Sequence, residues 1–288
     1  MQFSKYHALG NDYLVVEPDS LPADVPDDWV GRVCDRHRGV GADGVLLGPL
    51  PDSSGRLTLR IFNPDGSEAE KSGNGLRIFA RYLWDTQRVD ETPFAVETPG
   101  GRVTCCILDD GRSVTVEMGQ VSFDSRDIPV SGPRREVLDE EVSVGGGKFR
   151  FSAATVGNPH CVIFVDRPTP ALAREIGPLI ERDPRFPNRT NVQFVEVLDR
   201  AALRMEIWER GAGYTLASGS SSCAAAAVAY RLGLCNAGVA VTMPGGTLHV
   251  TIGPDFAATL TGPVTAVCHG NIAPELFAES MPPAKSSS

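Results

Sequence analysis

The sequence repeats itself at a distance of about half its length. Three pairs of features have nearly the same separation, of 146, 147 and 148 residues: Ser72 and Ser218, Gly10-Asn11 and Gly157-Asn158, and Asp43 and Asn191. Each serine stands between a polar loop and an apolar segment with helical periodicity. Chance similarity seldom gives three pairs with one period, so the chain is predicted to contain two copies of one structural unit.

The repeat predicts an α+β (α/β) fold with two pseudo-symmetric halves. Alternating apolar and polar residues indicate strands, so we expect each half to be a curved, mostly antiparallel sheet wrapped around a central helix. The N-terminal half should span 1–118, with 264–278 returning to it, and the C-terminal half should span 119–263. We expect the tail, 279–288, to be disordered because it is rich in proline and serine.

The two central helices are expected at 73–84 and 219–234. The first has a broad apolar surface, which is typical of a largely buried helix, and we expect Arg77 and Arg81 to reach outward. The second consists mainly of alanine with valine, tyrosine and leucine, so it should be tightly packed. The site should lie between the halves, where both helix starts and both Gly-Asn turns converge.

Composition excludes several classes of function. A net charge of -9 with scattered basic residues argues against a nucleic-acid or membrane surface. No apolar run approaches the roughly 18 residues that span a bilayer, and the N-terminus lacks the pattern of a signal peptide. Seven cysteines without CxxC spacing suit reduced thiols in a cytoplasm. His7, His37, His249 and His269 have no metal-ligand spacing, so we expect them to be structural and expect no metal.

The two helix starts carry the most informative chemistry. A helix N-terminus offers free N–H groups and a positive dipole end, and Gly73 and Gly219 permit close approach of a carboxylate. Two such ends aimed at one carboxylate would stabilise the charge that develops when an α-proton leaves. Ser72 and Ser218 are the candidates for the two faces of that α-carbon. Serine is also a preferred helix cap, and composition alone favours the capping role.

A second set of candidates consists of four asparagines at repeat-related loop positions: Asn11, Asn63, Asn158 and Asn191. Each alone is typical of a turn, but together they suit recognition of ammonium and carboxylate groups. Glu209-Arg210 is either a surface ion pair or a clamp on a zwitterion. His160 could relay a proton or bond locally, and we favour a supporting role. No GxSxG motif surrounds either serine, which argues against a serine hydrolase.

Along nearly its whole length the chain resembles the diaminopimelate epimerase family. The matching motifs are Gly10-Asn11-Asp12, Gly41-Ala42-Asp43-Gly44, Asn63-Pro64-Asp65-Gly66-Ser67-Glu68, Ser72-Gly73-Asn74-Gly75, Gly157-Asn158-Pro159-His160, Asn191-Val192 and Glu209-Arg210-Gly211-Ala212-Gly213. The resemblance implies two pseudo-symmetric halves and inversion of an amino-acid α-carbon without cofactor or metal. In the family, one cysteine acts as thiolate base and a second as thiol acid.

The resemblance also implies the roles of individual residues. Substrate binding would fall to Asn11, Asn63, Asn158, Asn191, Glu209 and Arg210. The reacting carboxylate would be held by the backbone at Gly73, Asn74, Gly219 and Ser220. The implied ligand is LL- or meso-diaminopimelate or a close analogue, which would place the chain in lysine biosynthesis. A homodimer formed through the outer sheets is left open.

The sequence departs from the family pattern at the residues that carry out the family's chemistry. Ser72 and Ser218 align with the two catalytic cysteines, and Gly44 and Tyr214 stand where the family usually has Gln and Glu. The next thiol, Cys223, is five residues beyond Ser218. A thiolate–thiol mechanism therefore cannot operate here, and the additional changes favour a natural divergent paralogue over an engineered mutant. Three hypotheses remain: an amino-acid epimerase, altered chemistry such as dehydration or double-bond isomerisation, and ligand binding without turnover.

Overall fold

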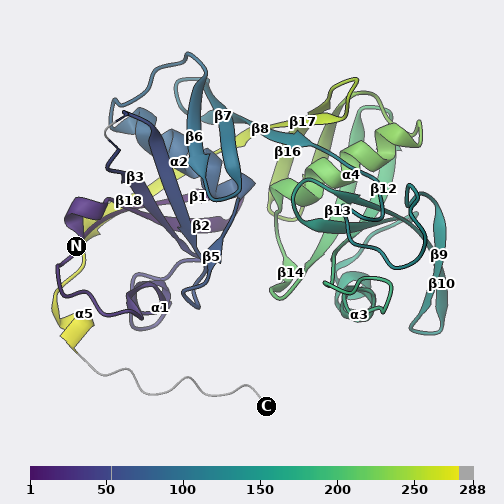
Figure 1. Ribbon diagram of the computed structural model, residues 1–288, viewed down its shortest axis with the longest axis horizontal. Helices are drawn as coiled ribbons and strands as arrows, with labels where there is room; N and C mark the ends of the chain where they lie inside the picture. Colours follow the sequence, from purple (N-terminus) through teal and green to yellow (C-terminus); the bar gives the residue numbers. More distant parts are fainter. Residues whose placement is uncertain (53, 279–288) are drawn as a thin grey trace.

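Two helices of equal length occupy the centres of two lobes (Figure 1). α2 (Gly73–Asp85) and α4 (Gly219–Arg231) have 13 residues each, and each begins directly after one of the paired serines. The computed structural model describes residues 1–52 and 54–278. The predicted disordered tail, 279–288, lies outside these described residues. Within them, no helix is long and apolar enough to cross a membrane.

The remaining elements follow the same order in both lobes. The N-terminal lobe contains β1 (Gln2–Ala8), β2 (Asn11–Val16), the 3₁₀ helix η1 (Pro18–Ser20), α1 (Trp29–Cys34), β3 (Val45–Leu50), β4 (Leu57–Phe62), β5 (Glu68–Ala69), β6 (Phe94–Thr98) and β7 (Gly101–Leu108). The C-terminal lobe contains β9 (Glu140–Val144), β10 (Gly147–Thr155), β11 (Pro159–Phe164), α3 (Pro170–Glu181), β12 (Asn191–Asp199), β13 (Ala202–Glu209), β14 (Gly213–Thr215), β15 (Gly238–Met243) and β16 (Gly246–Ile252).

Strand pairing repeats between the lobes as well. β1 and β2 are antiparallel, as are β10 and β11. β2 and β3 are parallel, as are β11 and β12, and the parallel pair β4 and β6 corresponds to β13 and β15. Matching pairings at matching positions confirm the predicted α+β fold with two pseudo-symmetric halves. Each lobe thus surrounds its helix with a sheet that is antiparallel in most of its pairings.

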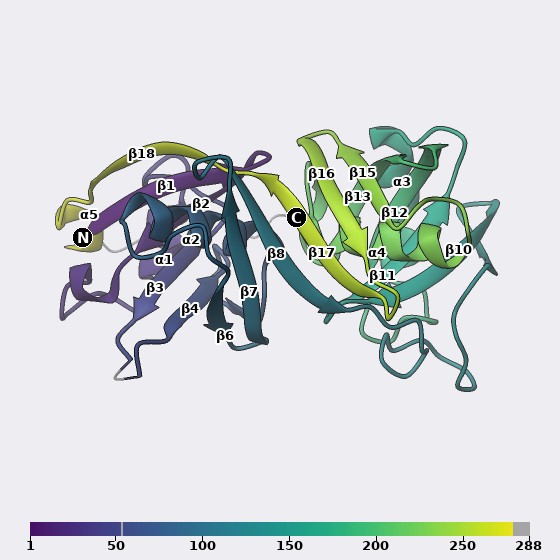
Figure 2. The same ribbon diagram turned by 90° about the horizontal axis from the view of Figure 1, so that it is seen from above.

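Two long strands join the lobes. β8 (Ser113–Gln120) pairs antiparallel with β17 (Ala257–Pro263), and Figure 2 shows both crossing from one lobe toward the other. The chain then returns through β18 (Thr265–Asn271), which pairs with β1, and ends with α5 (Glu275–Ala278). The C-terminal segment therefore lies in the N-terminal lobe, beside the first strand of the chain.

Burial of the central helices differs from the sequence prediction in one respect. Leu76, Phe79 and Leu83 are completely buried as expected, but the outward position predicted for Arg77 is wrong, since its side chain is 0% exposed. The helix lies where the lobes meet, so the second lobe covers the face that would otherwise reach solvent. Arg77 Nη1 donates to the carbonyl of Gly73 at 3.3 Å.

The second central helix ends earlier than predicted. α4 stops at Arg231 instead of continuing to Leu234. Gly233 adopts a φ of 73°, and its N–H bonds to the carbonyl of Tyr230 while the N–H of Leu234 bonds to Ala229. A glycine in the left-handed region with these bonds is a common helix terminator, and periodicity alone does not reveal it.

Candidate functional site

The starts of α2 and α4 touch at the boundary between the lobes. An ideal Cβ built on Gly219 would lie only 3.5 Å from the Cα of Gly73. For the N–H groups of Gly73, Asn74, Gly219 and Ser220, no hydrogen-bond acceptor is found within the described part of the chain. The structure thus brings together two helix N-termini with free donors, an arrangement suited to a carboxylate.

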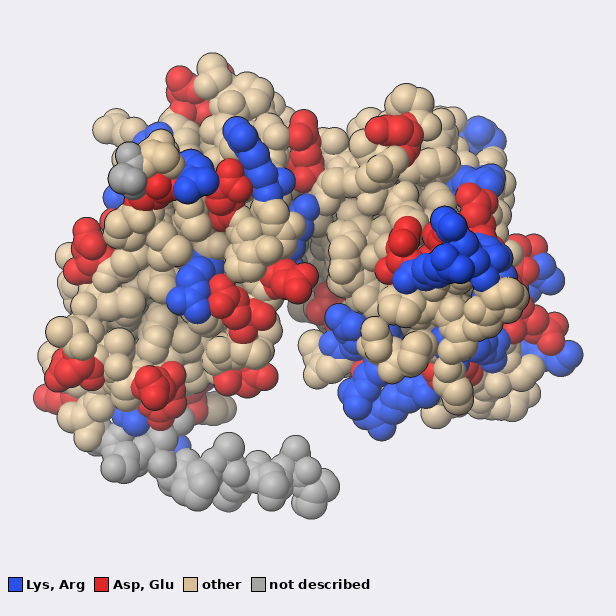
Figure 3. All heavy atoms as spheres, in the orientation of Figure 1, with Lys and Arg blue, Asp and Glu red and all other residues tan. Residues whose placement is uncertain are grey.

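Figure 3 shows a cleft between the two lobes. Two further cavities lie elsewhere. One of about 650 Å³ follows β1 and β18 on the N-terminal lobe, where Phe3, Tyr82 and His269 contribute to its lining. The other, of about 420 Å³, lies beside the junction of β8 and β17. Neither cavity contains a residue that the sequence assigned to the site.

Ser72 and Ser218 occupy equivalent positions but have different partners. Both precede their helices with extended backbone, as caps do. The hydroxyl oxygen of Ser72 accepts a hydrogen bond from the Gly75 N–H at 3.0 Å, so the capping role favoured by composition is present at this serine. The Ser218 hydroxyl makes no capping bond and lies close enough to the carboxyl group of Glu209 to lower its pKa.

Glu209 ends β13, and its carboxyl group points toward the start of α4. Burial raises the pKa of this carboxyl, the bond from Ser218 opposes the rise, and the charge of Asp43 across the cleft adds to it. The net pKa is raised. A carboxyl group with a raised pKa, placed against a hydroxyl, can accept a proton through that hydroxyl and release it later.

On the N-terminal side, two asparagines form a row of linked hydrogen bonds that ends at α2. Asn74 Nδ2 donates to Asn11 Oδ1 at 2.9 Å, and Asn11 Nδ2 donates to Asp43 Oδ2 at 2.9 Å. Arg77 Nη2 in turn donates to Asn74 Oδ1 at 2.8 Å. Both amides therefore have fixed orientations, with Asn74 buried and Asn11 partly exposed.

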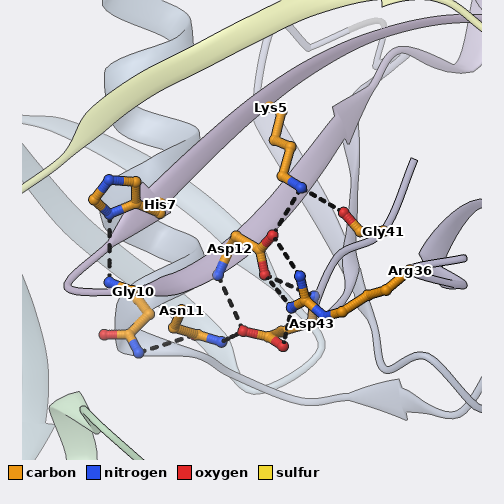
Figure 4. A network of polar contacts seen from close by, with 9 residues as sticks. Lys5, His7, Gly10, Asn11, Asp12, Arg36, Gly41 and Asp43 are labelled. Atoms are coloured by element: carbon orange, nitrogen blue, oxygen red, sulfur yellow. Dashed lines mark hydrogen bonds and ion pairs between the residues drawn. The ribbon is translucent and has the colours of Figure 1, made fainter. Parts of the chain in front are cut away.

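A cluster of charged residues holds these hydrogen-bonded asparagines in place (Figure 4). Asp12 forms ion pairs with Lys5 at 2.9 Å and with Arg36 at 2.6 Å, and Arg36 also pairs with Asp43 at 2.7 Å. Burial would raise the pKa of Asp12, but the hydrogen bonds of Arg36 and Lys5 outweigh it and lower the pKa to about 2. The carboxylate of Asp12 therefore stays charged and keeps Asp43 and Asn11 in position.

On the C-terminal side, a closed ring of hydrogen bonds fixes the start of α4. Asn158 Nδ2 donates to Ser220 Oγ at 3.3 Å, and Asn158 Oδ1 lies 2.9 Å from His160 Nε2. His160 Nδ1 lies 3.1 Å from Gln193 Nε2, which also donates to Ser221 Oγ at 3.0 Å. These contacts assign the proton of His160 to Nε2, with Nδ1 as acceptor.

His160 is neutral in this ring. Complete burial lowers its pKa, the charge of Arg210 lowers it further, and the bond with Gln193 opposes the fall, which leaves the pKa at about 3. The imidazole reaches the cleft only through Asn158. The geometry is that of a supporting group, and a direct contact between His160 and a ligand would require the ring of bonds to open.

The other predicted binding residues have hydrogen-bond partners that are not part of the two helix starts. Asn191 is buried, donates from Nδ2 to the carbonyl of Pro159 at 2.8 Å, and accepts from the Arg210 N–H at 3.0 Å. The Arg210 side chain is exposed. Asn63 donates to Ser67 Oγ at 2.9 Å within its own turn. Their side chains would have to exchange or extend these contacts to bind a ligand at the helix starts.

Two departures from the family pattern have different structural consequences. A Cβ at Gly44 would lie 2.4 Å from the carbonyl oxygen of Phe62 and 2.6 Å from Tyr13 Cε1, so no side chain fits there. Tyr214 points toward α3, where its hydroxyl donates to Glu206 at 2.6 Å and its ring lies 4.1 Å from the guanidinium of Arg174.

Sequence reasoning missed two residues of this site: Gln193 and Ser221. Gln193 is a polar residue in an apolar strand, which is a signal for a buried hydrogen bond. The thiol of Cys223 does not replace the missing cysteines, because it is completely buried and burial raises its pKa to about 12.

Comparison with known proteins shows what the chain resembles. A family model described as diaminopimelate epimerase matches residues 3–123 and 152–267. "Diaminopimelate epimerase 2" of Nostoc sp. is 57% identical over 278 residues, which cover 96% of this chain and 98% of that protein. The diaminopimelate epimerase of Moorella thermoacetica is 43% identical, with 94% of this chain and 99% of that protein covered.

Solved structures show the same fold at low sequence identity. A hydroxyproline epimerase from Agrobacterium vitis with bound trans-4-hydroxy-L-proline aligns with a TM-score of 0.68 at 19% identity, covering 96% of this chain and 93% of that chain. A methylitaconate-delta-isomerase aligns with a TM-score of 0.63 at 14% identity, covering 99% of both chains. At these identities the comparison shows a shared architecture only.

Proposed function

The chain belongs to the diaminopimelate epimerase family, and on that basis we propose that it binds an amino acid of the diaminopimelate type between its lobes and transfers the proton of the α-carbon. The observation that carries the proposal is the contact of the two helix starts. The N–H groups of Gly73, Asn74, Gly219 and Ser220 belong to these two adjacent helix starts, and each start directly follows one of the serines. A carboxylate bound there would place its α-carbon between the two hydroxyls.

In the proposed reaction, one face of the α-carbon loses a proton and the other face receives one. On one face, the Ser218 hydroxyl receives the α-proton as its own proton passes to the Glu209 carboxylate. On the other face, Ser72 delivers a proton to the α-carbon. The helix N-termini stabilise the negative charge that develops on the substrate carboxylate between these steps. A hydroxyl paired with a carboxylate takes the place of a thiolate.

The test is α-proton exchange in heavy water. The purified protein would be incubated with LL- and meso-diaminopimelate and an amino-acid panel, and mass spectrometry and chiral chromatography would follow deuterium uptake and inversion. We expect uptake with inversion of at least one stereoisomer, and loss of both in the Ser218→Ala variant. Uptake that persists in that variant would contradict the assignment of Ser218.

One observation favours a second candidate, ligand binding without turnover. The Ser72 hydroxyl is already engaged as a helix cap, which suits a purely structural role. The Ser72→Cys/Ser218→Cys variant separates the two candidates. Activity that appears only in this variant would mean that the natural protein recognises the amino acid but has lost the reaction. Mass spectrometry in the same experiment would detect loss of water, the mark of altered chemistry.

A further inference from the structure

Arg77 is a buried arginine without an acidic partner. Its side chain is 0% exposed, and among the described residues no carboxylate forms an ion pair with it. Its Nε is buried without a hydrogen-bond partner in the same part of the chain. Arg32, a second buried arginine, pairs with Asp28 at 2.8 Å. An unpaired charge in the interior is costly, because burial removes its hydration and supplies no counter-charge.

The guanidinium of Arg77 lies where the two lobes meet. On α2, Nη1 donates to the carbonyl of Gly73 at 3.3 Å, and Nη2 donates to Asn74 Oδ1 at 2.8 Å. On α4, a Cβ built on Gly219 would lie 3.6 Å from Nη1. On β17, a Cβ built on Gly262 would lie 3.4 Å from Nε. The side chain therefore contacts both helix starts and one of the strands that join the lobes.

The guanidinium of Arg77 stays charged at neutral pH. Burial lowers its pKa to about 10, which leaves it protonated at pH 7. The neighbouring thiol of Cys223 supplies no negative charge, because burial raises its pKa to about 12. Lys71 adds a second basic group just before α2, where its Nζ donates to the carbonyl of Met118 at 2.6 Å. The groups behind the helix starts are thus basic or neutral.

One peptide group connects Arg77 with the proposed carboxylate site. The carbonyl of Gly73, which accepts from Arg77 Nη1, belongs to the same peptide group as the N–H of Asn74. That N–H is one of the four for which no acceptor is found within the described part of the chain. A charged donor on the carbonyl polarises the peptide group, so its N–H becomes a stronger donor to an anion.

Resting on the proposed function, we propose that Arg77 is a positioning residue for the substrate carboxylate: the bound carboxylate supplies the counter-charge that Arg77 lacks in the free protein. The cation acts through the peptide group of Gly73 and Asn74 and through its field at the two helix starts, without touching the ligand. Ligand binding then offsets the cost of the buried charge. This explains an arginine at a place where an apolar side chain would pack at lower cost.

A first measurement needs no substrate. Ser72→Cys places a titratable thiol at the start of α2, and its alkylation by iodoacetamide between pH 6 and 10 can be followed by peptide mass spectrometry. A cation behind the helix start stabilises the thiolate. Adding Arg77→Met, which removes the charge and keeps much of the volume, should raise the thiol pKa by about half a unit and slow alkylation at pH 7.5 about threefold. An unchanged thiol pKa would overturn the proposal.

Two further variants in the Ser72→Cys background separate charge from packing. Arg77→Gln keeps a donor for the Gly73 carbonyl but has no charge, so it should raise the thiol pKa as much as Arg77→Met does. Arg81→Met is the matched control, because it removes an arginine one turn farther along α2 that pairs with Asp85 at 2.8 Å. It should leave the thiol pKa unchanged. A rise with Arg77→Met but not with Arg77→Gln, or an equal rise with Arg81→Met, would overturn the proposal.

A second measurement uses the ligand. In isothermal titration calorimetry with LL-diaminopimelate, Arg77→Met should bind about 30-fold more weakly than the natural protein, the order expected for two unit charges several ångströms apart in a partly buried site. Arg81→Met should bind as the natural protein does. Equal affinities of Arg77→Met and the natural protein would contradict the role of Arg77. If the natural protein does not bind diaminopimelate, the proposed function fails, while the thiol pKa still decides the role of Arg77.

Discussion

At the scale of the residue, surroundings rather than identity distinguish the two serines. Both are N-caps of equal helices in equivalent halves. Ser72 accepts a hydrogen bond from the backbone of Gly75, whereas Ser218 makes no capping bond and lies beside the carboxyl group of Glu209. Inversion needs one group that accepts a proton and a second group that donates one. Two serines with identical surroundings would not provide this difference.

The raised pKa of Glu209 predicts the acidic side of the pH profile. Only the ionised carboxyl can take the α-proton through Ser218, so exchange should decline as the pH falls through a pKa above 4.5, the ordinary value for Glu. Glu209→Gln should lower exchange by about 100-fold or more and abolish this decline. The pH dependence of exchange at low substrate measures both, and a decline centred at or below pH 4.5 would speak against Glu209 as the base.

Arg77 provides a prediction about stability. Its side chain is completely buried between the helices, so Arg77→Ala should lower the free energy of unfolding by about 3 kcal/mol through the cavity it leaves. Arg77→Met fills much of that volume and removes a buried charge, so it should cost clearly less. Urea denaturation would compare both with Arg81→Ala, a partly exposed residue paired with Asp85. An equal loss of free energy of unfolding in Arg77→Ala and Arg77→Met would refute the packing explanation.

At the scale of the element, the start of α4 is fixed by side chains from β11 and β12. The ring through Asn158, His160 and Gln193 returns to Ser220 and Ser221, the second and third residues of the helix. Asn158 thus has two tasks in the proposed function, since it would bind the ligand and it holds the helix start whose N–H groups would bind the carboxylate. The N-terminal lobe achieves the same with Asn11 and Asn74.

The neutral His160 makes this element sensitive to acid. Its pKa of about 3 in the folded protein lies below the ordinary value of 6.5, so the unfolded chain binds the proton more readily. The stability from this group is complete above pH 6.5 and is lost as the pH falls toward 3. By pH 5 the loss should reach about 2 kcal/mol, at 1.36 kcal/mol per pH unit.

The His160→Gln variant isolates this effect. Its glutamine does not titrate, so the variant should be less stable than the natural protein at pH 7 but should lose less free energy of unfolding between pH 7 and pH 5. Urea denaturation at pH 7 and at pH 5 gives the free energy of unfolding of each protein at each pH. The same loss in both proteins would show that His160 is not the titrating group.

Sequence reasoning placed the elements well because period, turn and cap signals are local. The helix predicted at 73–84, which the structure extends to Asp85, and both Gly-Asn turns follow from such signals. The prediction for Arg77 was wrong because a charged residue on a helix is expected to be exposed, and the sequence does not show that the second lobe covers it. The ring of hydrogen bonds through Gln193 was missed because it joins residues that lie far apart in the sequence, a contact that no period records.

At the scale of the whole molecule, duplication explains why the site lies between the lobes. β8 and β17 hold the halves together, and the two helices meet at their first glycines, so the proposed carboxylate site would need donors from both lobes. The cleft between the lobes leaves room for a ligand to enter (Figure 3). The central claim is therefore that one amino acid is held by both halves at once.

The measurement that tests this claim most directly is a titration of the ¹⁵N-labelled protein with diaminopimelate, followed by amide chemical shifts. The amides of Gly73 and Asn74 in one lobe and of Gly219 and Ser220 in the other should shift together, with one dissociation constant. An analogue without the α-carboxylates should leave these four amides unmoved. Shifts confined to a single lobe, or caused equally by that analogue, would contradict a carboxylate site shared by the two helix starts.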